Sequence, residues 1–308
     1  MLEHLETENY YDYTHVSKND VTVVVPTLNE EKAIGLVLRG LLLEGFSKLL
    51  VVDGNSIDRT VEIAERMDVE AIPQKGQGKT GAIATAISRI KTPYFVVIDG
   101  DYTYKPSDIE NLIKKASSFN HIIGARQDQK NIKLLNRFGN KMINLLFNLF
   151  FGSNINDVCS GLYLLKTSFA RELFLETKGF DVEVEIAAQS AINQVITEVP
   201  ISYDKRIGIQ KLNPLKDGFI IVSTIFRLAK KYNPLMFYSF LASGLTIFFG
   251  LSVFTLSALK IINFNFDNVG SLQFIAVIPF LFMGYFVLQY RFVKSGKYKF
   301  INKPFPGT

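Results

Sequence analysis

Short runs of aliphatic and β-branched residues alternate with helical stretches along the first third of the chain. Strands that alternate with helices in this way build a parallel sheet with helices on both faces. The sequence therefore predicts an α/β domain. Its first predicted strands are 21–25, 48–52, a weaker one near Ala71 and 94–98, separated by helices that end at about Leu43 or span 60–67 and 81–90. Further strands are expected at 122–124, 162–165 and 195–203, and a helix at 182–193.

Acidic residues follow several of the predicted strands. Glu30 comes after the first strand, Asp53 after the second, and Asp99 with Asp101 after the fourth. The carboxyl ends of parallel strands lie along one edge of a sheet, where α/β folds bind their ligands, so we expect these carboxylates to converge. Clustered carboxylates repel each other unless a cation or a hydrogen-bonding ligand satisfies them. The pattern indicates a site for a divalent cation and a nucleotide.

The segment Asp99-Gly100-Asp101 lies directly after the apolar run 94–98. Two carboxylates at the end of a buried strand offer hard oxygen ligands to a divalent cation that also holds a phosphate. Taken alone, the same three residues fit an ordinary turn, because Asp and Gly are common at strand ends. The other strand-end carboxylates favour the metal site.

The segment Gly76–Thr80 resembles the end of a phosphate-binding P-loop. The P-loop pattern requires a glycine five residues before Gly78, and that position is Pro73. The sequence therefore disfavours an ATPase or a GTPase. A mobile glycine-lysine loop over a diphosphate is still expected, because glycine lets backbone N–H groups approach and Lys79 adds positive charge.

Two long stretches near the carboxyl end contain no charged residue. They are Leu235–Leu259 and Ser271–Tyr290, in a chain that is 48% hydrophobic and has a mean hydropathy of +0.17. Each is long enough to cross a bilayer as a helix, which takes roughly 20 apolar residues, although a pair of buried core helices is the alternative. The flanking basic residues are Arg227, Lys230 and Lys231 before the first stretch and Arg291, Lys294, Lys297 and Lys299 after the second. By the positive-inside rule, we expect a transmembrane hairpin with both ends in the cytoplasm.

The remaining composition excludes several classes of protein. Residues 3–13 are acidic and aromatic, unlike a cleavable signal peptide, so we expect most of the chain in the cytosol. Cys159 is the only cysteine, which excludes an internal disulfide, and the three histidines form no recognisable ligand or triad pattern. The net charge of +5 reflects the basic residues around the apolar stretches, and no tract of basic and aromatic residues indicates nucleic-acid binding.

Two helical stretches have the pattern of helices that lie in a membrane interface. In 133–151 the apolar residues Leu134, Phe138, Met142, Leu145 and Leu149 share one face, and Arg137, Asn140, Asn144 and Asn148 share another. A surface helix that faces a protein core would show the same periodicity. The stretch 219–231 is apolar and then basic, and we expect it to rest on lipid headgroups.

Several segments together resemble the motifs of glycosyltransferase family 2, in the order in which that family has them. They are Pro26-Thr27-Leu28-Asn29-Glu30, 52–58, 76–79 and Asp99-Gly100-Asp101, followed by Gly124–Arg126 for Gly-x-Arg, Asp157–Gly161 for Asp-x-x-Ser-Gly and Arg206–Leu212 for Arg-x-Gly-x-Ser-Lys-Leu. Within the family, the chain is similar to polyprenyl-phosphate sugar synthases, including dolichyl-phosphate mannose synthases and archaeal dolichyl-phosphate hexose transferases. The resemblance implies a Rossmann-like GT-A nucleotide-diphospho-sugar transferase domain with a mainly parallel sheet.

The resemblance also implies roles for individual residues. The nucleotide sugar would be bound by Pro26, Thr27, Asn29, Glu30, Asp53, Gly78, Lys79, Asp99, Gly100 and Asp101. Asp99 and Asp101 would hold Mg²⁺ or Mn²⁺ and, with Arg126, form the catalytic set. The acceptor phosphate would be held by Arg126, Arg137, Ser160, Arg206 and Lys211. The departures from the family pattern are Thr103 in place of a metal-binding glutamine, Gly54 in place of a second aspartate and Gln210 in place of serine.

The reaction implied is inverting transfer of one sugar from a nucleoside-diphosphate sugar to a membrane polyprenyl phosphate. GDP-mannose, UDP-glucose and UDP-N-acetylglucosamine are all compatible donors, and the product would be a lipid-linked monosaccharide for protein or cell-surface glycosylation. A polyprenyl phosphate is already an anion and needs cationic groups rather than a general base. We therefore expect arginine and lysine side chains to hold it, because arginine suits bidentate phosphate contacts.

Two alternative functions remain open from the sequence. A transferase with a hydroxyl acceptor would need a catalytic carboxylate near Glu183 or Glu185, and many such enzymes carry a Gln-x-x-Arg-Trp motif, whereas this chain has no tryptophan. A non-catalytic membrane scaffold would have lost its metal ligands, and both aspartates are present. Asp157, Glu183 and Glu185 could position groups near the donor, and the last two could instead cap or face a helix.

The expected organisation is an N-terminal extension (1–19), a GT-A domain (20–210), interfacial amphipathic helices (211–233), two transmembrane helices within 234–292 and a basic cytoplasmic tail (293–308). The catalytic domain would lie on the cytoplasmic face of the membrane. The expected partners are the nucleotide sugar, the polyprenyl phosphate and the lipid bilayer, with no nucleic acid, and self-association is left open.

Overall fold

A computed structural model describes residues 16–127, 134–209, 211, 213–259 and 284–292. The chain divides into two compact units. The first comprises Met1–Asn131, Ser160–Glu172 and Ile196–Gln210, and the second comprises Ile132–Cys159, Leu173–Val195 and Lys211–Thr308. The units are described in turn.

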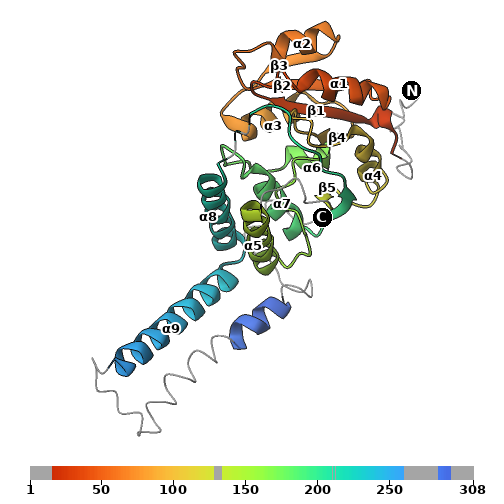
Figure 1. The fold of residues 1–308 in the computed structure, drawn as a ribbon. Helices are drawn as coiled ribbons and strands as arrows, with labels where there is room; N and C mark the ends of the chain where they lie inside the picture. Colours follow the sequence, from red (N-terminus) through yellow and green to blue (C-terminus); the bar gives the residue numbers. More distant parts are fainter. Residues whose placement is uncertain (1–15, 128–133, 210, 212, 260–283, 293–308) are drawn as a thin grey trace, which may run out of the picture. The chain divides into compact units, whose positions relative to one another are not determined.

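The first unit is built on a seven-stranded sheet with the order β3-β2-β1-β4-β6-β5-β7 (Figure 1). Neighbouring strands of this sheet pair in parallel, except that β6 runs antiparallel to both β4 and β5. This confirms the mostly parallel sheet expected from the alternation of strands and helices. The strands are β1 (Val21–Thr27), β2 (Leu49–Asp53), β3 (Glu70–Pro73), β4 (Tyr94–Val97), β5 (His121–Arg126), β6 (Tyr163–Lys166) and β7 (Ile196–Ile201).

Helices cover this sheet and bury its central strands. All four residues of β4 are buried, and so are the five of β2, as expected for strands that are covered on both faces. Helix α3 packs on β1 and β2, and α4 packs on β5, β6 and β7. The helices of this unit are η1 (Lys18–Asp20), α1 (Ile34–Leu43), α2 (Thr60–Arg66), α3 (Gly78–Arg89), η2 (Pro106–Asp108), α4 (Ile109–Ile113) and α6 (Thr167–Arg171).

Helix α3 begins at Gly78, three residues before the start expected from the sequence. Gly78 has a φ of 57°, a left-handed conformation that glycine adopts without steric cost. The expectation of a mobile loop is therefore wrong for Gly78 and Lys79, which form the first turn of a helix. The amino end of that helix adds partial positive charge beside the Lys79 side chain.

The second unit is helical. It contains α5 (Leu134–Phe151), α7 (Val182–Ile192), α8 (Pro214–Tyr232) and α9 (Pro234–Ala258), with α8 in contact with each of the other three. Aromatic rings from three of these helices pack edge to face. The ring centre of Phe150 lies 5.5 Å from that of Phe226 and 5.4 Å from that of Phe240. Asn233 separates α8 from α9 and donates a side-chain hydrogen bond to the Phe150 carbonyl.

Helix α5 turns its asparagines toward the protein. Asn148 exchanges hydrogen bonds with the backbone of Ile155, and Asn144 accepts one from the Val158 N–H. Asn144 and Asn148 lie on the polar face expected from the sequence, and the backbone of residues 155–158 covers that face. Three residues of the expected apolar face, Phe138, Met142 and Leu145, are exposed.

Within the residues that the structure describes, one helix is long and apolar enough to cross a membrane. It spans Pro234–Ser252 with a mean hydropathy of 1.6 and matches the first predicted span. Most of the second predicted span, 271–283, the loop before it and the basic tail lie outside the described residues, and 284–292 is helical. The described residues therefore show one apolar helix, and the two-helix hairpin stays a prediction.

Candidate active site

The Asp99-Gly100-Asp101 segment leaves the sheet directly after β4. The backbone N–H of Ile98 still donates to the Val24 carbonyl, so the segment starts from a fixed position beside β1. A Cβ atom on Gly100 would come within 3.1 Å of the Thr27 side chain, which explains the small residue between the two carboxylates. Asp101 is buried, whereas the Asp99 side chain is 29% exposed.

Two cationic side chains pair with these aspartates. Lys79 Nζ lies 2.6 Å from Asp99 Oδ1, and Arg206 Nη1 lies 2.7 Å from Asp101 Oδ2. The other terminal nitrogen of Arg206, Nη2, lies 2.6 Å from Glu30 Oε1. The structure therefore joins Glu30, Asp101 and Arg206 directly, from three distant parts of the sequence.

Burial and the negative charge of Asp99 raise the pKa of Asp101. Hydrogen bonds from the Thr103 hydroxyl and backbone N–H, together with Arg206, oppose this shift. Thr103 thus orients the Asp101 carboxylate through its hydroxyl and its backbone N–H. A buried carboxylate whose charge is disfavoured by a neighbouring carboxylate fits a divalent cation, and Mg²⁺ commonly uses one or two carboxylates plus substrate phosphates.

The four strand-end carboxylates do not form one cation cluster. In the described part of the chain, no group of three or more His, Cys, Asp or Glu side chains is arranged to hold a metal ion. Asp53 is occupied elsewhere, since it accepts hydrogen bonds from Thr27 and from the hydroxyl and N–H of Ser56. Of the four carboxylates expected to lie together, Asp99 and Asp101 are neighbours in one segment. Glu30 is joined to Asp101 through ion pairs with Arg206.

Asp53 and Asn29 instead shape the loops that follow β2 and β1. Asn29 has a φ of 51°, its N–H donates to Ser56, and its side-chain oxygen accepts from the Ile57 N–H. Pro26 and Thr27 are the last two residues of β1, and Thr27 lies opposite Asp53 of β2. A Cβ atom on Gly54 would lie 3.2 Å from the Thr27 carbonyl and 3.3 Å from Gln74 Oε1. These residues form the part of the sheet edge that the sequence assigns to the nucleotide.

The Ser160-Gly161 segment approaches the Asp99 carboxylate through Gly161. A Cβ atom on Gly161 would come within 2.0 Å of Asp99 Oδ2, so only glycine leaves room for the carboxylate. The Gly161 N–H donates to the Tyr104 hydroxyl at 2.7 Å, and Ser160 is buried. Tyr104 is a site residue that the sequence reasoning missed, and its position after Asp-x-Asp was the available signal.

Arg126 ends strand β5 in the same unit. Its guanidinium carbon lies 5.0 Å from the centre of the Tyr203 ring. Tyr203 was also missed by the sequence reasoning, because nothing in its local sequence distinguishes it from a core aromatic. Arg137 and Lys211, the other two cations expected at the acceptor phosphate, belong to the second unit.

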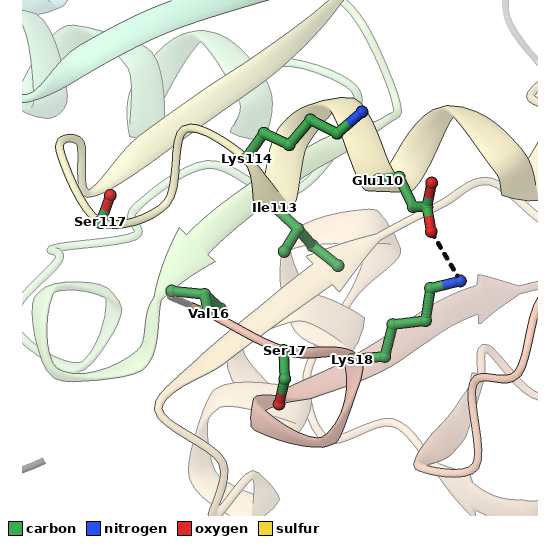
Figure 2. Close-up of a pocket in the computed structure, with 7 residues that line it drawn as sticks. All are labelled: Val16, Ser17, Lys18, Glu110, Ile113, Lys114 and Ser117. Carbon is green, nitrogen blue, oxygen red and sulfur yellow. Dashed lines mark ion pairs between the residues drawn. The ribbon is translucent and has the colours of Figure 1, made fainter. Parts of the chain in front are cut away.

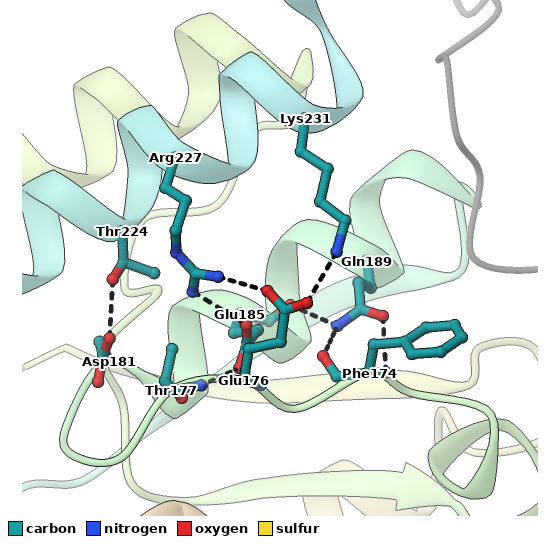
Figure 3. A network of polar contacts seen from close by, with 9 residues as sticks. All are labelled: Phe174, Glu176, Thr177, Asp181, Glu185, Gln189, Thr224, Arg227 and Lys231. Atoms are coloured by element: carbon teal, nitrogen blue, oxygen red, sulfur yellow. Dashed lines mark hydrogen bonds and ion pairs between the residues drawn. The ribbon is translucent and has the colours of Figure 1, made fainter.

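The acidic residues Glu183 and Glu185 also belong to the second unit, in the first turn of α7. Glu185 is 1% exposed and accepts hydrogen bonds from the backbone N–H groups of Glu176 and Thr177 and from Arg227 of α8 (Figure 3). Asp181 accepts one from Thr224, also of α8. Glu185 therefore ties the 176–177 loop and α8 to α7, as a structural residue would.

A pocket of about 330 Å³ lies elsewhere on the first unit (Figure 2). Its lining includes the ion pair between Lys18 and Glu110, with 2.9 Å between Nζ and Oε1. None of the residues that the sequence assigns to the nucleotide, metal or acceptor lines it. The pocket therefore has no part in the candidate site.

Comparison with known proteins agrees with this geometry. The sequence profile described as "Glycosyl transferase family 2" matches residues 22–174. Glycosyltransferase AglJ of Haloferax volcanii is 35% identical over 230 residues, which cover 71% of this chain and 75% of that protein. Dolichyl-phosphate hexose transferase of the same organism is 30% identical over 222 residues, 70% of this chain and 96% of that protein.

Among solved structures, the fold resembles that of glucosyl-3-phosphoglycerate synthase from Mycobacterium tuberculosis, determined in complex with Mn²⁺, uridine diphosphate and glucosyl-3-phosphoglycerate. The TM-score is 0.56 at 17% identity, over 68% of this chain and 79% of that one. The two chains share the GT-A fold. Given this fold, its Asp-x-Asp segment and the matching relatives, the chain belongs to glycosyltransferase family 2.

Proposed function

We propose that this protein transfers a single sugar from a nucleoside-diphosphate sugar to a polyprenyl phosphate, with a divalent cation bound by Asp99 and Asp101. The observation that carries the proposal is the placement of these aspartates. Burial and the charge of Asp99 raise the pKa of Asp101, and each aspartate is paired with a basic side chain, Asp99 with Lys79 and Asp101 with Arg206. A carboxylate pair of this kind suits a cation that bridges to a diphosphate.

Two further points support a metal-bound nucleotide sugar as donor. The structurally similar synthase holds Mn²⁺ and uridine diphosphate. The first turn of α3 places Lys79 beside Asp99, where a lysine and a helix amino end would both attract a diphosphate. We assign Pro26, Thr27, Asn29, Glu30, Asp53, Gly78, Lys79 and Gly100 to this donor.

The proposed chemistry is an in-line displacement at the anomeric carbon. An acceptor phosphate oxygen forms the new bond to that carbon as the bond to the diphosphate oxygen breaks, and the departing oxygen keeps the electron pair. This displacement inverts the configuration and requires no general base, because the attacking oxygen is already anionic. A bound divalent cation would supply charge neutralisation at the leaving diphosphate.

A polyprenyl phosphate is the proposed acceptor because two observations favour a lipid over a soluble alcohol. A relative that matches 96% of its own length is named as a dolichyl-phosphate hexose transferase. The second unit carries the apolar helix Pro234–Ser252 and exposed apolar residues on amphipathic helices, Phe138 and Met142 on α5 and Phe219 on α8. In the first unit we assign the phosphate to Arg126, Ser160 and Arg206. The roles expected of Arg137 and Lys211, which belong to the second unit, stay predictions from the sequence.

These features also suggest membrane association. We propose that α9 anchors the protein and that the catalytic unit lies on the cytoplasmic face, because the basic residues Arg227, Lys230 and Lys231 come directly before α9.

Transfer of labelled sugar to polyprenyl phosphate by the full-length protein in detergent tests the proposal. GDP-mannose, UDP-glucose and UDP-N-acetylglucosamine would be offered separately with Mg²⁺ or Mn²⁺. We expect Asp101→Asn to lower transfer by about 100-fold or more, which corresponds to about 2.7 kcal/mol of lost transition-state stabilisation. Asp68→Asn is the matched control, because Asp68 is exposed in the same unit and has a φ of 60° that asparagine tolerates. Undiminished transfer by Asp101→Asn, or transfer without any divalent cation, would contradict the metal role.

A further inference from the structure

The hydroxyl of Tyr104 joins the loop that follows Asp99-Gly100-Asp101 to Gly161. It accepts the Gly161 N–H at 2.7 Å, across 57 positions of the sequence. Both residues are buried, Tyr104 with 3% of its surface exposed. A buried N–H needs an acceptor, because leaving it unsatisfied costs the full desolvation of the group. The bond therefore ties the Gly161 backbone to the loop that carries the aspartates.

Gly161 in turn lies directly against Asp99. A Cβ atom on Gly161 would come within 2.8 Å of all three atoms of the Asp99 carboxyl group, well inside van der Waals contact. The carboxyl group therefore packs on the Gly161 backbone itself, while its Oδ1 lies 2.6 Å from Lys79 Nζ. A shift of the Gly161 backbone would move the carboxylate with it.

We propose that Tyr104 is a positioning residue, whose hydroxyl holds Gly161 against Asp99 and thereby fixes the Asp99 carboxylate relative to Asp101 for a divalent cation. This inference rests on the proposed function for the presence of that cation. It assigns Tyr104 no contact with the cation and no part in the chemical step.

The chain from Asp101 to Tyr104 is held at several points, so the tyrosine starts from a fixed position. The Thr103 N–H donates to Asp101 Oδ1 at 3.0 Å. The Asp101 carbonyl accepts the Ile207 N–H at 3.0 Å, and the Thr103 carbonyl accepts the Asp204 N–H at 2.8 Å. Tyr104 therefore belongs to a loop whose backbone is fixed beside Asp101.

Both partners of the hydrogen bond are also held from outside this loop. Tyr203 contacts the Tyr104 ring edge to face, with 5.4 Å between ring centres and 67° between ring planes. Leu162, the residue after Gly161, is joined to β5 because its carbonyl accepts the Gly124 N–H at 2.8 Å. The hydroxyl and the N–H thus meet between two anchored segments, and the bond sets the separation of those segments.

The two aspartates are oriented in different ways. Thr103 orients Asp101 directly, through hydrogen bonds from its hydroxyl and its N–H. Asp99 is held by Lys79 and by packing on Gly161. Groups behind a metal ligand fix its geometry, and their loss typically lowers metal affinity 10-fold to 100-fold. The Tyr104 hydroxyl supports Asp99 in this way, through one intervening residue.

Removal of the hydroxyl tests this inference through the binding of Mn²⁺ alone. Tyr104→Phe and Tyr104→Met are made in parallel, so that the outcome does not depend on one variant folding. The Kd for Mn²⁺, measured by electron paramagnetic resonance on the full-length protein in detergent, is expected to rise about tenfold in both. Tyr94→Phe is the matched control, because it removes the hydroxyl of another buried tyrosine, at the end of β4 opposite to Asp99. Its Kd should equal that of the wild type.

A double-mutant cycle separates this role from a general loss of stability. Gly161→Ala displaces the Asp99 carboxylate directly. If Tyr104 acts through Gly161, adding Tyr104→Phe to Gly161→Ala should change the Kd for Mn²⁺ little further, whereas independent effects would multiply.

A second measurement does not depend on a metal ion. The carboxyl-carbon signal of Asp99 is recorded by NMR on the full-length protein with isotope-labelled aspartate and assigned with Asp99→Asn. We expect this signal to shift in both Tyr104 variants and to stay in place in Tyr94→Phe. An unchanged signal, a wild-type Kd in both Tyr104 variants, or effects that multiply in the cycle overturn the inference. If the wild type binds no Mn²⁺, the metal role in the proposed function fails, and the carbon signal still decides whether Tyr104 positions Asp99.

Discussion

Nη1 of Arg206 lies 2.7 Å from Oδ2 of Asp101, although the two residues are 105 positions apart in the sequence. The Asp101 side chain is 8% exposed and that of Arg206 is 26% exposed, so water screens this ion pair only partly. A guanidinium on a proposed metal ligand competes with the metal. The sequence assigned Arg206 to the acceptor phosphate, and in the structure its contacts are with two carboxylates.

Arg206→Gln should therefore strengthen the binding of Mn²⁺ alone. Removal of a cation from Asp101 and Glu30 leaves two buried carboxylates with uncompensated charge, which a metal ion can satisfy. We expect the Kd for Mn²⁺ to fall roughly tenfold, equivalent to about 1.4 kcal/mol. Free Mn²⁺ measured by electron paramagnetic resonance gives this Kd.

The control for this experiment is Arg59→Gln. Arg59 also pairs with a glutamate, Glu31, but its side chain is 71% exposed and the distance is 3.4 Å. Its removal should leave the Kd for Mn²⁺ unchanged. Equal or weaker Mn²⁺ binding by Arg206→Gln would show that Arg206 does not compete with the cation.

Gly161→Ala should impair catalysis through Asp99. The new methyl group would lie 2.0 Å from Asp99 Oδ2, far inside van der Waals contact, so the carboxylate must move. Displacement of this proposed metal ligand is expected to lower kcat/KM for the nucleotide sugar by roughly 10-fold to 100-fold. Gly139→Ala is the matched control, because a Cβ atom there has nothing within 4 Å. Equal steady-state rates for the two variants would show that the position of Asp99 does not limit the reaction.

The local sequence was sufficient to predict the positions of the strands and the place of the Asp-x-Asp segment directly after a buried strand. The runs at β1, β2 and β4 are buried and consist largely of valine and leucine, so their composition reports their environment. The antiparallel direction of β6 was not predicted, because the direction of a strand depends on the path of the chain between elements. The start of α3 at Gly78 was missed because glycine is a poor helix former in general and is tolerated at this end by its left-handed φ.

The partners of the site residues were less predictable than their identities. Arg206 with Asp101 and Arg126 with Tyr203 are contacts between residues far apart in sequence, and the position of each cation within the site follows from packing. The same holds for Asp53, which was assigned to the nucleotide sugar and whose partners in the structure are Ser56 and Thr27. The types of the site residues indicated the kind of ligand, whereas the contacts that each residue makes depend on the fold.

Glu185→Gln should separate the proposed reaction from transfer to a hydroxyl acceptor. If Glu185 is structural, the variant weakens charge-assisted hydrogen bonds from two backbone N–H groups and from Arg227. The free energy of unfolding should fall by about 2 kcal/mol, and transfer at a temperature below unfolding should persist. The exposed Glu172→Gln is the control. Loss of transfer without loss of stability would instead favour a catalytic carboxylate at this position.

His121 should make the stability of the first unit depend on pH. It is buried against the ring of Tyr163, and burial lowers its pKa to about 3. In the unfolded chain a histidine has a pKa of about 6.5. Between these values the unfolded state takes up a proton that the folded state does not, so stability is fully present above about pH 6.5 and falls as the pH decreases toward 3.

The expected loss between pH 7.5 and pH 5 is about 2 kcal/mol, because each pH unit below 6.5 costs about 1.4 kcal/mol. Urea unfolding of the wild type, His121→Phe and His121→Asn across this range measures it. Both variants will differ from the wild type in absolute stability, since either side chain packs differently against Tyr163. The test is therefore the slope with pH, which should be smaller in both variants by the same amount because other titrating groups contribute equally to all three proteins. Three parallel curves would show that His121 becomes protonated within the fold or is exposed to water there.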